Sequence, residues 1–186
     1  MYNGIINIYK EKGYTSHDVV AKLRGILKQK NIGHTGTLDP DAEGVLPVCL
    51  GKATKLCDIL TDKEKTYMVE MVLGQATDTQ DITGKIILKT DISQMRNTVT
   101  DEAISDNILS FTGEYDQIPP MYSAVKVNGK KLYELAREGK EIERQPRRVV
   151  IKKINILSIE YPYIAMEVCC SKGTYIRTLC HDIGIR

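Results

Sequence analysis

The chain has 186 residues, of which 42% are hydrophobic and 27% are charged, with a formal net charge of +2 at pH 7. That composition is ordinary for a globular protein with one hydrophobic domain core, or slightly more. No apolar run approaches the roughly 18–20 residues of a membrane span, and the N-terminus has no secretory signal, so we expect a cytoplasmic protein.

Hydrophobic periodicity and turn residues predict a mixture of helices and strands. The first helix has a clear start, because Thr15 and Asp18 form a capping box. There is no regular βαβ alternation, which favours the α+β class with a mixed, mostly antiparallel sheet flanked by helices. In chain order we predict strand 4–10, helix 15–30, apolar run 45–51, helix 53–62, strand 65–74, polar loop 75–84, strand 85–89, helix 100–113, a strand with an Asn-Gly turn within 117–131, helix 131–140, strands 147–160 and 163–171, and helix 174–186.

Two common kinds of site are excluded by residue spacing. The five cysteines form no C-x-x-C pair, and His181 beside Cys180 has no partner at zinc spacing, so we expect reduced thiols and no metal. The stretch "LGKAT" (50–54) is not a phosphate-binding P-loop, because Ala53 follows the Gly-Lys pair and Leu46 stands where the first glycine is needed.

The stretch "NIGHTGTLDPDAEG" (31–44) is too rich in glycine, proline and acidic residues for a regular helix or strand. Gly36 permits a sharp bend, and Pro40 biases Asp39 toward an extended backbone. Such a loop can present one carboxylate as a nucleophile or general base. From the local sequence alone, an Asp-Pro turn without chemistry is the better-supported interpretation.

Positive charge is concentrated in residues 126–153, where ten Lys or Arg face four Glu, a net charge of +6 against −4 for the rest of the chain. This block indicates either a polyanion-binding surface or a solvated helix face. In "CSKGTYIRTL" (170–179), Tyr175 and Arg177 would share a face if the segment is extended. Together with Lys172 they offer an aromatic surface and two cations, or simply a strand-to-helix corner with a satisfied arginine.

Four ordered motifs resemble the TruB-type tRNA pseudouridine synthases, which isomerise uridine at position 55 of the tRNA T loop. The resemblance covers nearly the whole chain. One departure is Lys10-Glu11, where the family has a proline after the early lysine. The motifs are "GHTGTLDPDAEGVLPVCLGKATK" (33–55), "KTYMVEMVLGQATDTQD" (65–81), "IPPMYSAVKVNGKKLYELAREG" (118–139) and "CSKGTYIRTL" (170–179).

The resemblance implies a role for individual residues of the reaction site. Asp39 would be the catalytic aspartate, and Arg177 would pair with it and keep it ionised. Tyr67 would stack on the flipped uracil and is a candidate to take the C5 proton. Tyr175 would line the pocket, and His34 would pack into the T loop where the uridine leaves its stack.

The resemblance also implies how the RNA is held. Residues 118–148 would be an insertion that grips the T stem-loop, and Lys130, Arg147, Arg148 and Lys172 would bind the substrate. No cofactor or metal is implied, and we expect a monomer.

The family members continue beyond the last motif. Residues 1–186 are therefore expected to be a catalytic domain that is incomplete at its C-terminal side and lacks the C-terminal RNA-binding domain. The alternatives are a guide-RNA-dependent pseudouridine synthase and a tRNA-binding or tRNA-folding module without turnover.

Overall fold

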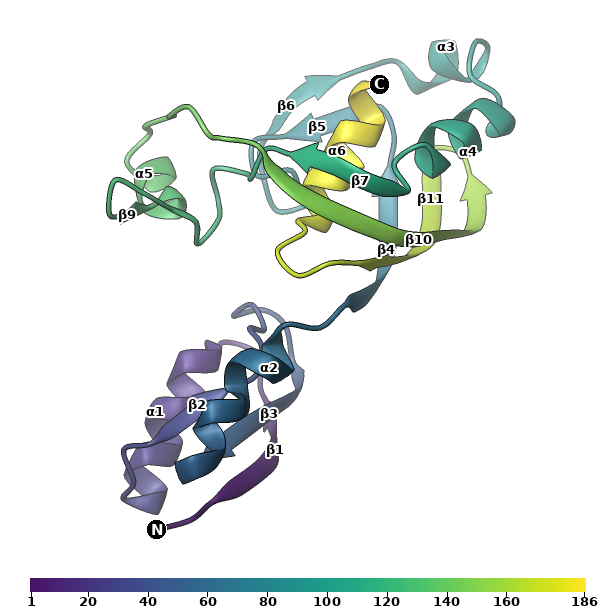
Figure 1. Ribbon diagram of the computed structural model, residues 1–186. Coiled ribbons are helices and arrows are strands. Elements are labelled where there is room, and N and C mark those ends of the chain that lie inside the picture. The colour runs from purple at the N-terminus through teal and green to yellow at the C-terminus, as the bar shows by residue number, and fades with distance from the viewer. The chain divides into compact units, whose positions relative to one another are not determined.

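The computed structural model describes residues 1–186, which form two compact units (Figure 1). The N-terminal unit comprises Met1–Lys63 and the C-terminal unit comprises Glu64–Arg186. None of the helices has the length and apolar character needed to cross a membrane.

The N-terminal unit is a three-stranded antiparallel sheet with helices packed on it. The strand order is β1-β3-β2, and Asn7 pairs with Pro47 at the centre of the β1–β3 ladder. The core of this unit joins α1 to the sheet through Val19, Val20, Ile32, Leu46, Val48 and Leu50. The elements are β1 (Gly4–Lys10), α1 (Ser16–Leu27), β2 (Ile32–His34), β3 (Gly44–Leu50), the 3₁₀ helix η1 (Gly51–Leu56) and α2 (Cys57–Thr61).

Helix α1 begins where the capping box predicts. The Thr15 hydroxyl accepts from the Asp18 N–H at 3.0 Å, and the Asp18 carboxylate accepts from the Thr15 N–H at 2.8 Å. The helix ends at Leu27, before the predicted residue 30, because Lys28 takes the left-handed conformation with φ 49°. Its N–H donates to the Arg24 carbonyl and closes the last turn.

The prediction that residues 31–44 contain no strand was wrong at the start of the stretch. Residues 32–34 form β2, with Ile32 opposite Leu50 and His34 opposite Val48. The buried Ile32 side chain and the ladder with β3 outweigh the local glycine signal.

The C-terminal unit is built on a four-stranded antiparallel sheet of order β4-β11-β10-β7. Strand β10 is 14 residues long and pairs with both of its neighbours, and two bulges interrupt its ladder with β11. The elements are β4 (Lys65–Val72), β5 (Gln75–Thr77), β6 (Ile86–Lys89), α3 (Ile92–Arg96), α4 (Asp101–Leu109), β7 (Gly113–Gln117), β8 (Lys126–Val127), β9 (Lys130–Lys131), α5 (Leu132–Arg137), β10 (Arg147–Glu160), β11 (Tyr163–Cys170) and α6 (Ile176–Ile185).

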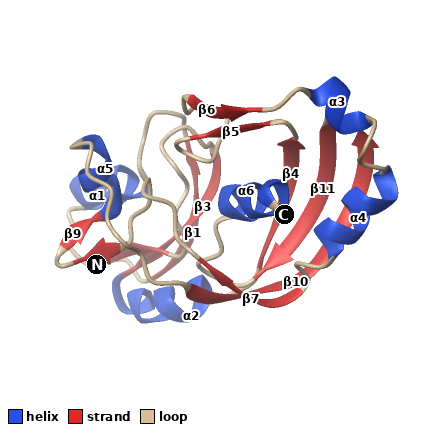
Figure 2. Ribbon diagram, turned by 90° about the horizontal axis from the view of Figure 1, so that it is seen from above, coloured by secondary structure: helices blue, strands red, loops and turns tan.

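One core holds this sheet to the helices α4 and α6. The alternate residues of β11 that face the core are all buried, as a strand with one covered face requires. The Asn107 amide of α4 donates to the Ile183 carbonyl of α6 at 2.9 Å, so the two helices are neighbours. Figure 2 shows α6 inside the curve of the sheet. The core comprises Val69, Met71, Ile104, Ile108, Phe111, Ile151, Ile154, Ile164, Met166, Val168, Cys170, Leu179 and Ile183.

Three elements of this unit were not predicted. Strand β5 lies inside the predicted polar loop, where it pairs with β6. Strand β7 has the polar sequence GEYDQ and exists because it pairs with β10, Gly113 opposite Ile151 and Gln117 opposite Arg147. Helix α3 is a short turn that the Asp91 side chain caps.

The segment between β7 and β10 folds around a small core of its own. The predicted Asn-Gly turn is confirmed, with φ 50° at Asn128 and 83° at Gly129, and it joins β8 to β9. Helix α5 follows directly. The core of the segment is Met121, Leu132 and Leu135.

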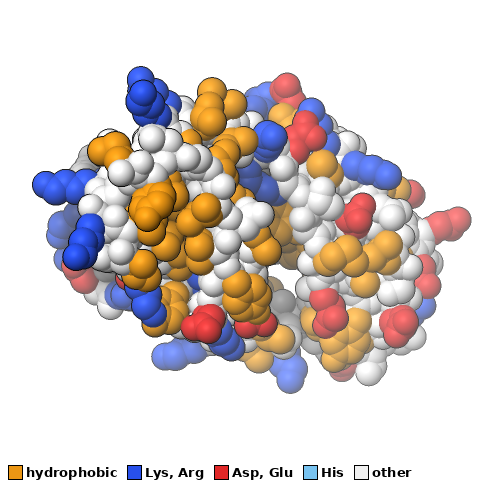
Figure 3. Space-filling view, turned by 90° about the horizontal axis from the view of Figure 1, so that it is seen from below, with side chains coloured by type: hydrophobic (Ala, Val, Ile, Leu, Met, Phe, Trp, Pro, Cys, Tyr) orange, Lys and Arg blue, Asp and Glu red, His pale blue; other side chains and the backbone are white.

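The five cysteines are all free thiols, with Cys49 and Cys170 buried and the other three half-buried. Exposed hydrophobic side chains occur in both units. On the face drawn in Figure 3, such side chains gather in patches beside Lys and Arg.

Candidate active site

Asp39 lies on the connection between β2 and β3, two adjacent strands of one sheet. Immediately before it, Leu38 is held by the buried Ser16 side chain. The Ser16 hydroxyl accepts from the Leu38 N–H at 2.9 Å and donates to the Leu38 carbonyl at 3.2 Å. The Asp39 side chain itself is exposed, so an anchored backbone presents this carboxylate to solvent.

Immediately after Asp39, the buried Lys10 holds Pro40. Lys10 is 0% exposed, and its ammonium group donates to the carbonyls of Glu11, Tyr14 and Pro40 at 3.0, 2.6 and 3.3 Å. A buried ammonium needs this many acceptors to offset its lost hydration. The Gly13 N–H also donates to the Pro40 carbonyl at 2.8 Å. The loop around Asp39 is therefore fixed on both sides.

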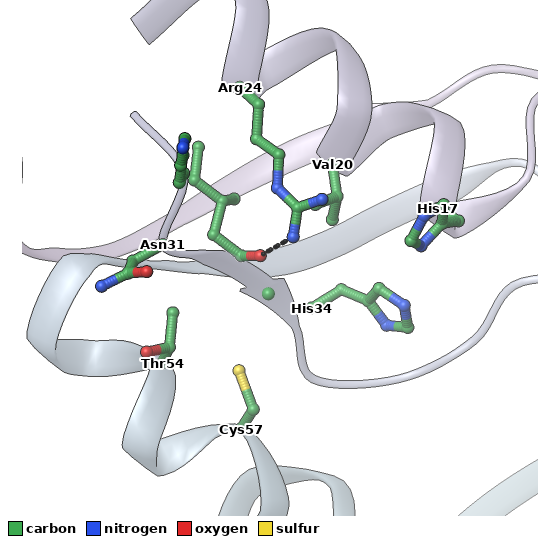
Figure 4. Close-up of a pocket in the computed structure, with 10 residues that line it drawn as sticks. His17, Val20, Arg24, Asn31, His34, Thr54 and Cys57 are labelled. Atoms are coloured by element: carbon green, nitrogen blue, oxygen red, sulfur yellow. Dashed lines mark hydrogen bonds between the residues drawn. The ribbon is translucent and has the colours of Figure 1, made fainter. Parts of the chain in front are cut away.

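His34 is half-buried at the end of β2. Its Nδ1 atom is buried and has no hydrogen-bond partner. The ring lines a pocket of the N-terminal unit, drawn in Figure 4.

The C-terminal unit has a pocket of about 590 Å³ beside β4. Tyr67 and Arg177 both line it, and Tyr67 is 40% exposed. The family resemblance implies one reaction site for these two residues, and the structure brings both to this pocket. The other lining residues are Met68, Val69, Glu70, Met71, Val72, Gln75, Ala76, Thr77, Gln80, Asp81, Ile82, Ile176, Cys180 and His181.

Arg177 is held by an acid that the sequence analysis did not single out. Its Nη1 atom lies 2.9 Å from the Asp81 carboxylate, and its Nη2 donates to the Tyr122 carbonyl. Burial raises the pKa of Asp81, but hydrogen bonds from Thr83, Thr79 and Arg177 outweigh it and hold that pKa below its usual value. The pairing of Arg177 with Asp39, which would join the two units, stays a prediction.

Tyr175 and Arg177 do not share an extended face. Helix α6 begins at Ile176, and residues two apart on a helix point in different directions. Tyr175 is the N-cap residue. Its backbone exchanges two hydrogen bonds with the buried Gln117 amide, at 2.8 and 3.0 Å. Of the two interpretations of this segment, the structure has the strand-to-helix corner with a satisfied arginine.

The sequence analysis predicted a polar loop at residues 75–84 but not that it contacts α6 and holds Arg177. Gln80 has φ 62°, and its side-chain carbonyl accepts from the Thr178 hydroxyl at 2.7 Å. Asp81 is the next residue and carries the ion pair with Arg177. The Thr and Asp residues of the motif ending in T-D-T-Q-D are typical of a polar turn, but they carry no sign of its partner on α6.

Cys180 also lines the pocket but is not a nucleophile at neutral pH. Burial raises the pKa of its thiol to about 12, so the thiolate is scarce.

The predicted RNA-binding cations have different surroundings. Lys130, Arg147 and Lys172 are exposed. Arg148 is bound by two acids, with Asp116 at 2.6 Å and Glu114 at 3.0 Å, and these contacts raise its pKa. Its charge is therefore partly neutralised, whereas Arg147 forms no ion pair.

In the segment between β7 and β10, a tyrosine ring lies close to two of the basic side chains. The Lys131 ammonium and the Arg137 guanidinium lie 5.3 and 5.4 Å from the Tyr133 ring centroid. Cations beside an aromatic ring are a common arrangement on nucleic-acid-binding surfaces.

The comparison with protein families decides the assignment. The family model described as TruB family pseudouridylate synthase (N terminal domain) matches residues 24–176. The chain belongs to this family. Among TruB relatives, the tRNA pseudouridine synthase B of Lachnoclostridium phytofermentans is 62% identical over 190 residues, covering 98% of this chain and 60% of the relative. That of Staphylococcus epidermidis is 50% identical over 191 residues, covering 100% of this chain and 62% of the relative.

Solved structures show the same fold for this TruB chain. A chain of the Cbf5-Nop10-Gar1 complex matches with a TM-score of 0.65 and 35% identity, covering 98% of this chain and 44% of that one. A chain of an H/ACA RNP bound to a substrate RNA containing 2'-deoxyuridine matches with a TM-score of 0.62 and 30% identity, covering 98% and 42%. The sequence spans about 60% of the length of its curated relatives.

Proposed function

We propose that this chain is a tRNA pseudouridine synthase that isomerises uridine 55 of the T loop. The observation that carries the proposal is the fixed loop around Asp39, in a chain 62% identical to a tRNA pseudouridine synthase B. The substrate would be the T stem-loop of tRNA, bound by a cytoplasmic monomer without a metal or cofactor. Residues 1–186 would be a catalytic domain, and residues 118–148 would be its RNA-gripping insertion.

The reaction exchanges one glycosidic bond for another. The C1′–N1 bond breaks, the base turns, C1′ bonds to C5, and the C5 proton leaves as N1 gains a proton, so substrate and product are isomers. The uridine must first leave its stack, at a cost of a few kcal/mol. Stacking on Tyr67 at the mouth of the C-terminal pocket would recover about 1–3 kcal/mol.

Each proposed residue has a physical role in this scheme. Asp39 supplies the carboxylate, as a nucleophile or a general base. Arg177 would keep it ionised once the two side chains meet, because a guanidinium within a few ångströms lowers the pKa of a carboxyl group. Tyr175 would line the base pocket, and His34 would pack into the T loop.

Substrate RNA would be held by Lys130, Arg147, Arg148 and Lys172. The exposed cations would attract phosphates, so binding should weaken as salt increases. Neutralising Lys130, Arg147 and Arg148 together should lower both the affinity and its salt dependence.

Two alternative functions, a guide-RNA-dependent synthase and a non-catalytic tRNA-binding module, predict different results. A guide-RNA-dependent synthase would need a second RNA, but identity to the tRNA pseudouridine synthases B reaches 62%, against 35% for the Cbf5 chain. A non-catalytic tRNA-binding module would bind without turnover.

The deciding experiment incubates the chain with a bare T stem-loop RNA and maps pseudouridine in the product. We expect conversion of one uridine by the wild type, and none by Asp39→Asn, with RNA affinity within about twofold of wild type because the substitution removes no phosphate contact. Binding without conversion by the wild type would support the non-catalytic module. Conversion by Asp39→Asn would show that the carboxylate is not required.

A further inference from the structure

A second pocket, in the N-terminal unit, has the chemistry of an anion site. It has a volume of about 460 Å³ and lies between α1, β2 and η1. No acidic side chain lines it. The polar side chains that do so are those of His17, Arg24, Lys30, Asn31, His34 and Thr54.

The two permanent cations of this pocket are not neutralised by the protein. Arg24 donates from Nη2 to the Ile32 carbonyl at 3.2 Å, which fixes its guanidinium beside β2, as Figure 4 shows. Its other N–H groups are available to a ligand. Neither Arg24 nor Lys30 forms an ion pair with an acidic residue. A pocket with two uncompensated positive charges attracts anions.

His34 gives an independent sign that a partner is missing. Its Nδ1 atom is buried without a hydrogen bond, whereas buried polar atoms in proteins are almost always paired. Figure 4 shows the rings of His17 and His34 toward the same side of the pocket. The Asn31 amide adds a neutral hydrogen-bond donor to the imidazoles and cations, whereas the Thr54 hydroxyl already donates to the Gly51 carbonyl at 2.8 Å.

We infer that this pocket binds a backbone phosphate of the RNA, together with its ribose. The volume exceeds that of a lone phosphate group, and the donors suit phosphate oxygens. His34 leads directly into the loop that carries Asp39, so a phosphate bound here would fix the RNA strand beside that loop. Naming RNA as the source of the phosphate rests on the proposed function; the anion site itself rests on the pocket.

The test compares two double variants with the same change in charge. Arg24→Gln/Lys30→Gln removes the cations of the pocket, and Lys22→Gln/Lys28→Gln removes two exposed lysines of the same region that do not line it. Binding of a fluorescent T stem-loop RNA is measured from about 50 to about 200 mM KCl.

We expect the pocket variant to lower the slope of log K against log [salt] by about 0.7–0.9 for each phosphate that it no longer binds, and the control variant to lower it clearly less. Lys30→Gln alone is a second variant that removes no intramolecular hydrogen bond, and it should lower the slope whether or not the double variant folds fully. Ethylation of single RNA phosphates should identify one position that weakens binding to the wild type but not to the pocket variant.

Equal slopes for the pocket variant and the wild type, or equal reductions in both double variants, would overturn the inference. Pseudouridine mapping separates this result from the proposed function. If the wild type converts uridine while the pocket variant keeps the wild-type slope, the isomerase proposal stands and phosphate binding in the pocket is rejected. If the wild type binds RNA without converting it, and the pocket variant has a lower slope, phosphate binding in the pocket stands and the isomerase proposal is rejected.

Discussion

Replacing Lys10 by methionine tests whether a buried ammonium group holds the Asp39 loop. Methionine keeps the apolar stem of similar length and removes the three donors. The three carbonyls that lose their hydrogen bond to the ammonium differ in whether another donor remains. The Pro40 carbonyl keeps the Gly13 N–H at 2.8 Å, and the Glu11 carbonyl keeps a weak bond from the Tyr14 N–H at 3.4 Å.

The Tyr14 carbonyl carries most of the expected cost. Its bond to the ammonium is the shortest of the three, at 2.6 Å, and it has no other donor. Leaving this part-buried acceptor unpaired costs up to about 1–3 kcal/mol, and the weakened bonds of the other two add to it. Removing the desolvated charge offsets part of the loss. We therefore expect Lys10→Met to lower the free energy of unfolding by about 2 kcal/mol.

Urea unfolding followed by far-UV circular dichroism measures this change, with Lys12→Met as the control. Lys12 is exposed and two residues away, so its substitution should change stability by no more than about 0.5 kcal/mol. Lys10→Met should also slow pseudouridine formation more than it weakens RNA binding, because the loop loses its anchor at Pro40. If the two methionine variants unfold at the same urea concentration, the ammonium does not hold the loop.

Three further predictions concern the C-terminal unit. Tyr67→Phe should bind RNA normally and convert it slowly in single-turnover assays; an unchanged rate would remove the hydroxyl from the chemistry. Asp81→Asn should lower the free energy of unfolding by about 1 kcal/mol at neutral pH, because the ion pair with Arg177 is removed. Folding lowers the pKa of Asp81, so its contribution is present above the ordinary aspartate pKa of about 3.9 and is lost as pH falls through the lowered value. The urea midpoints of wild type and variant should therefore converge as the pH is lowered past that point. Arg147→Gln should reduce the salt dependence of RNA binding more than Arg148→Gln does, because Arg148 is already paired with two acids; equal effects would contradict that reasoning.

Sequence patterns confined to a few neighbouring residues were sufficient to predict many of the helices, strands and turns. The capping box of Thr15 and Asp18 fixed the start of α1, and the Asn128-Gly129 pair fixed the turn between β8 and β9. Alternating side chains identified β4, and Tyr161-Pro162 separated the two segments predicted as the strand pair β10 and β11. These features depend on dihedral preferences and on which side of an element is apolar, and both are written in consecutive residues.

Contacts between distant residues decided what the sequence did not predict. Strand β7 is polar and forms because β10 supplies its ladder, and β2 forms against β3 despite its glycine. A lysine next to an exposed loop gives no local sign of burial, yet Lys10 is fully buried.

The candidate site shows the same division. Gly36 and Pro40 made Asp39 a candidate in the sequence, and the family resemblance then implied its catalytic role. The acid that holds Arg177 did not stand out, because Asp81 lies 96 residues away along the chain. An ion pair depends on where two chain segments meet, and only the packing of α6 against the turn after β5 brings these two charges together.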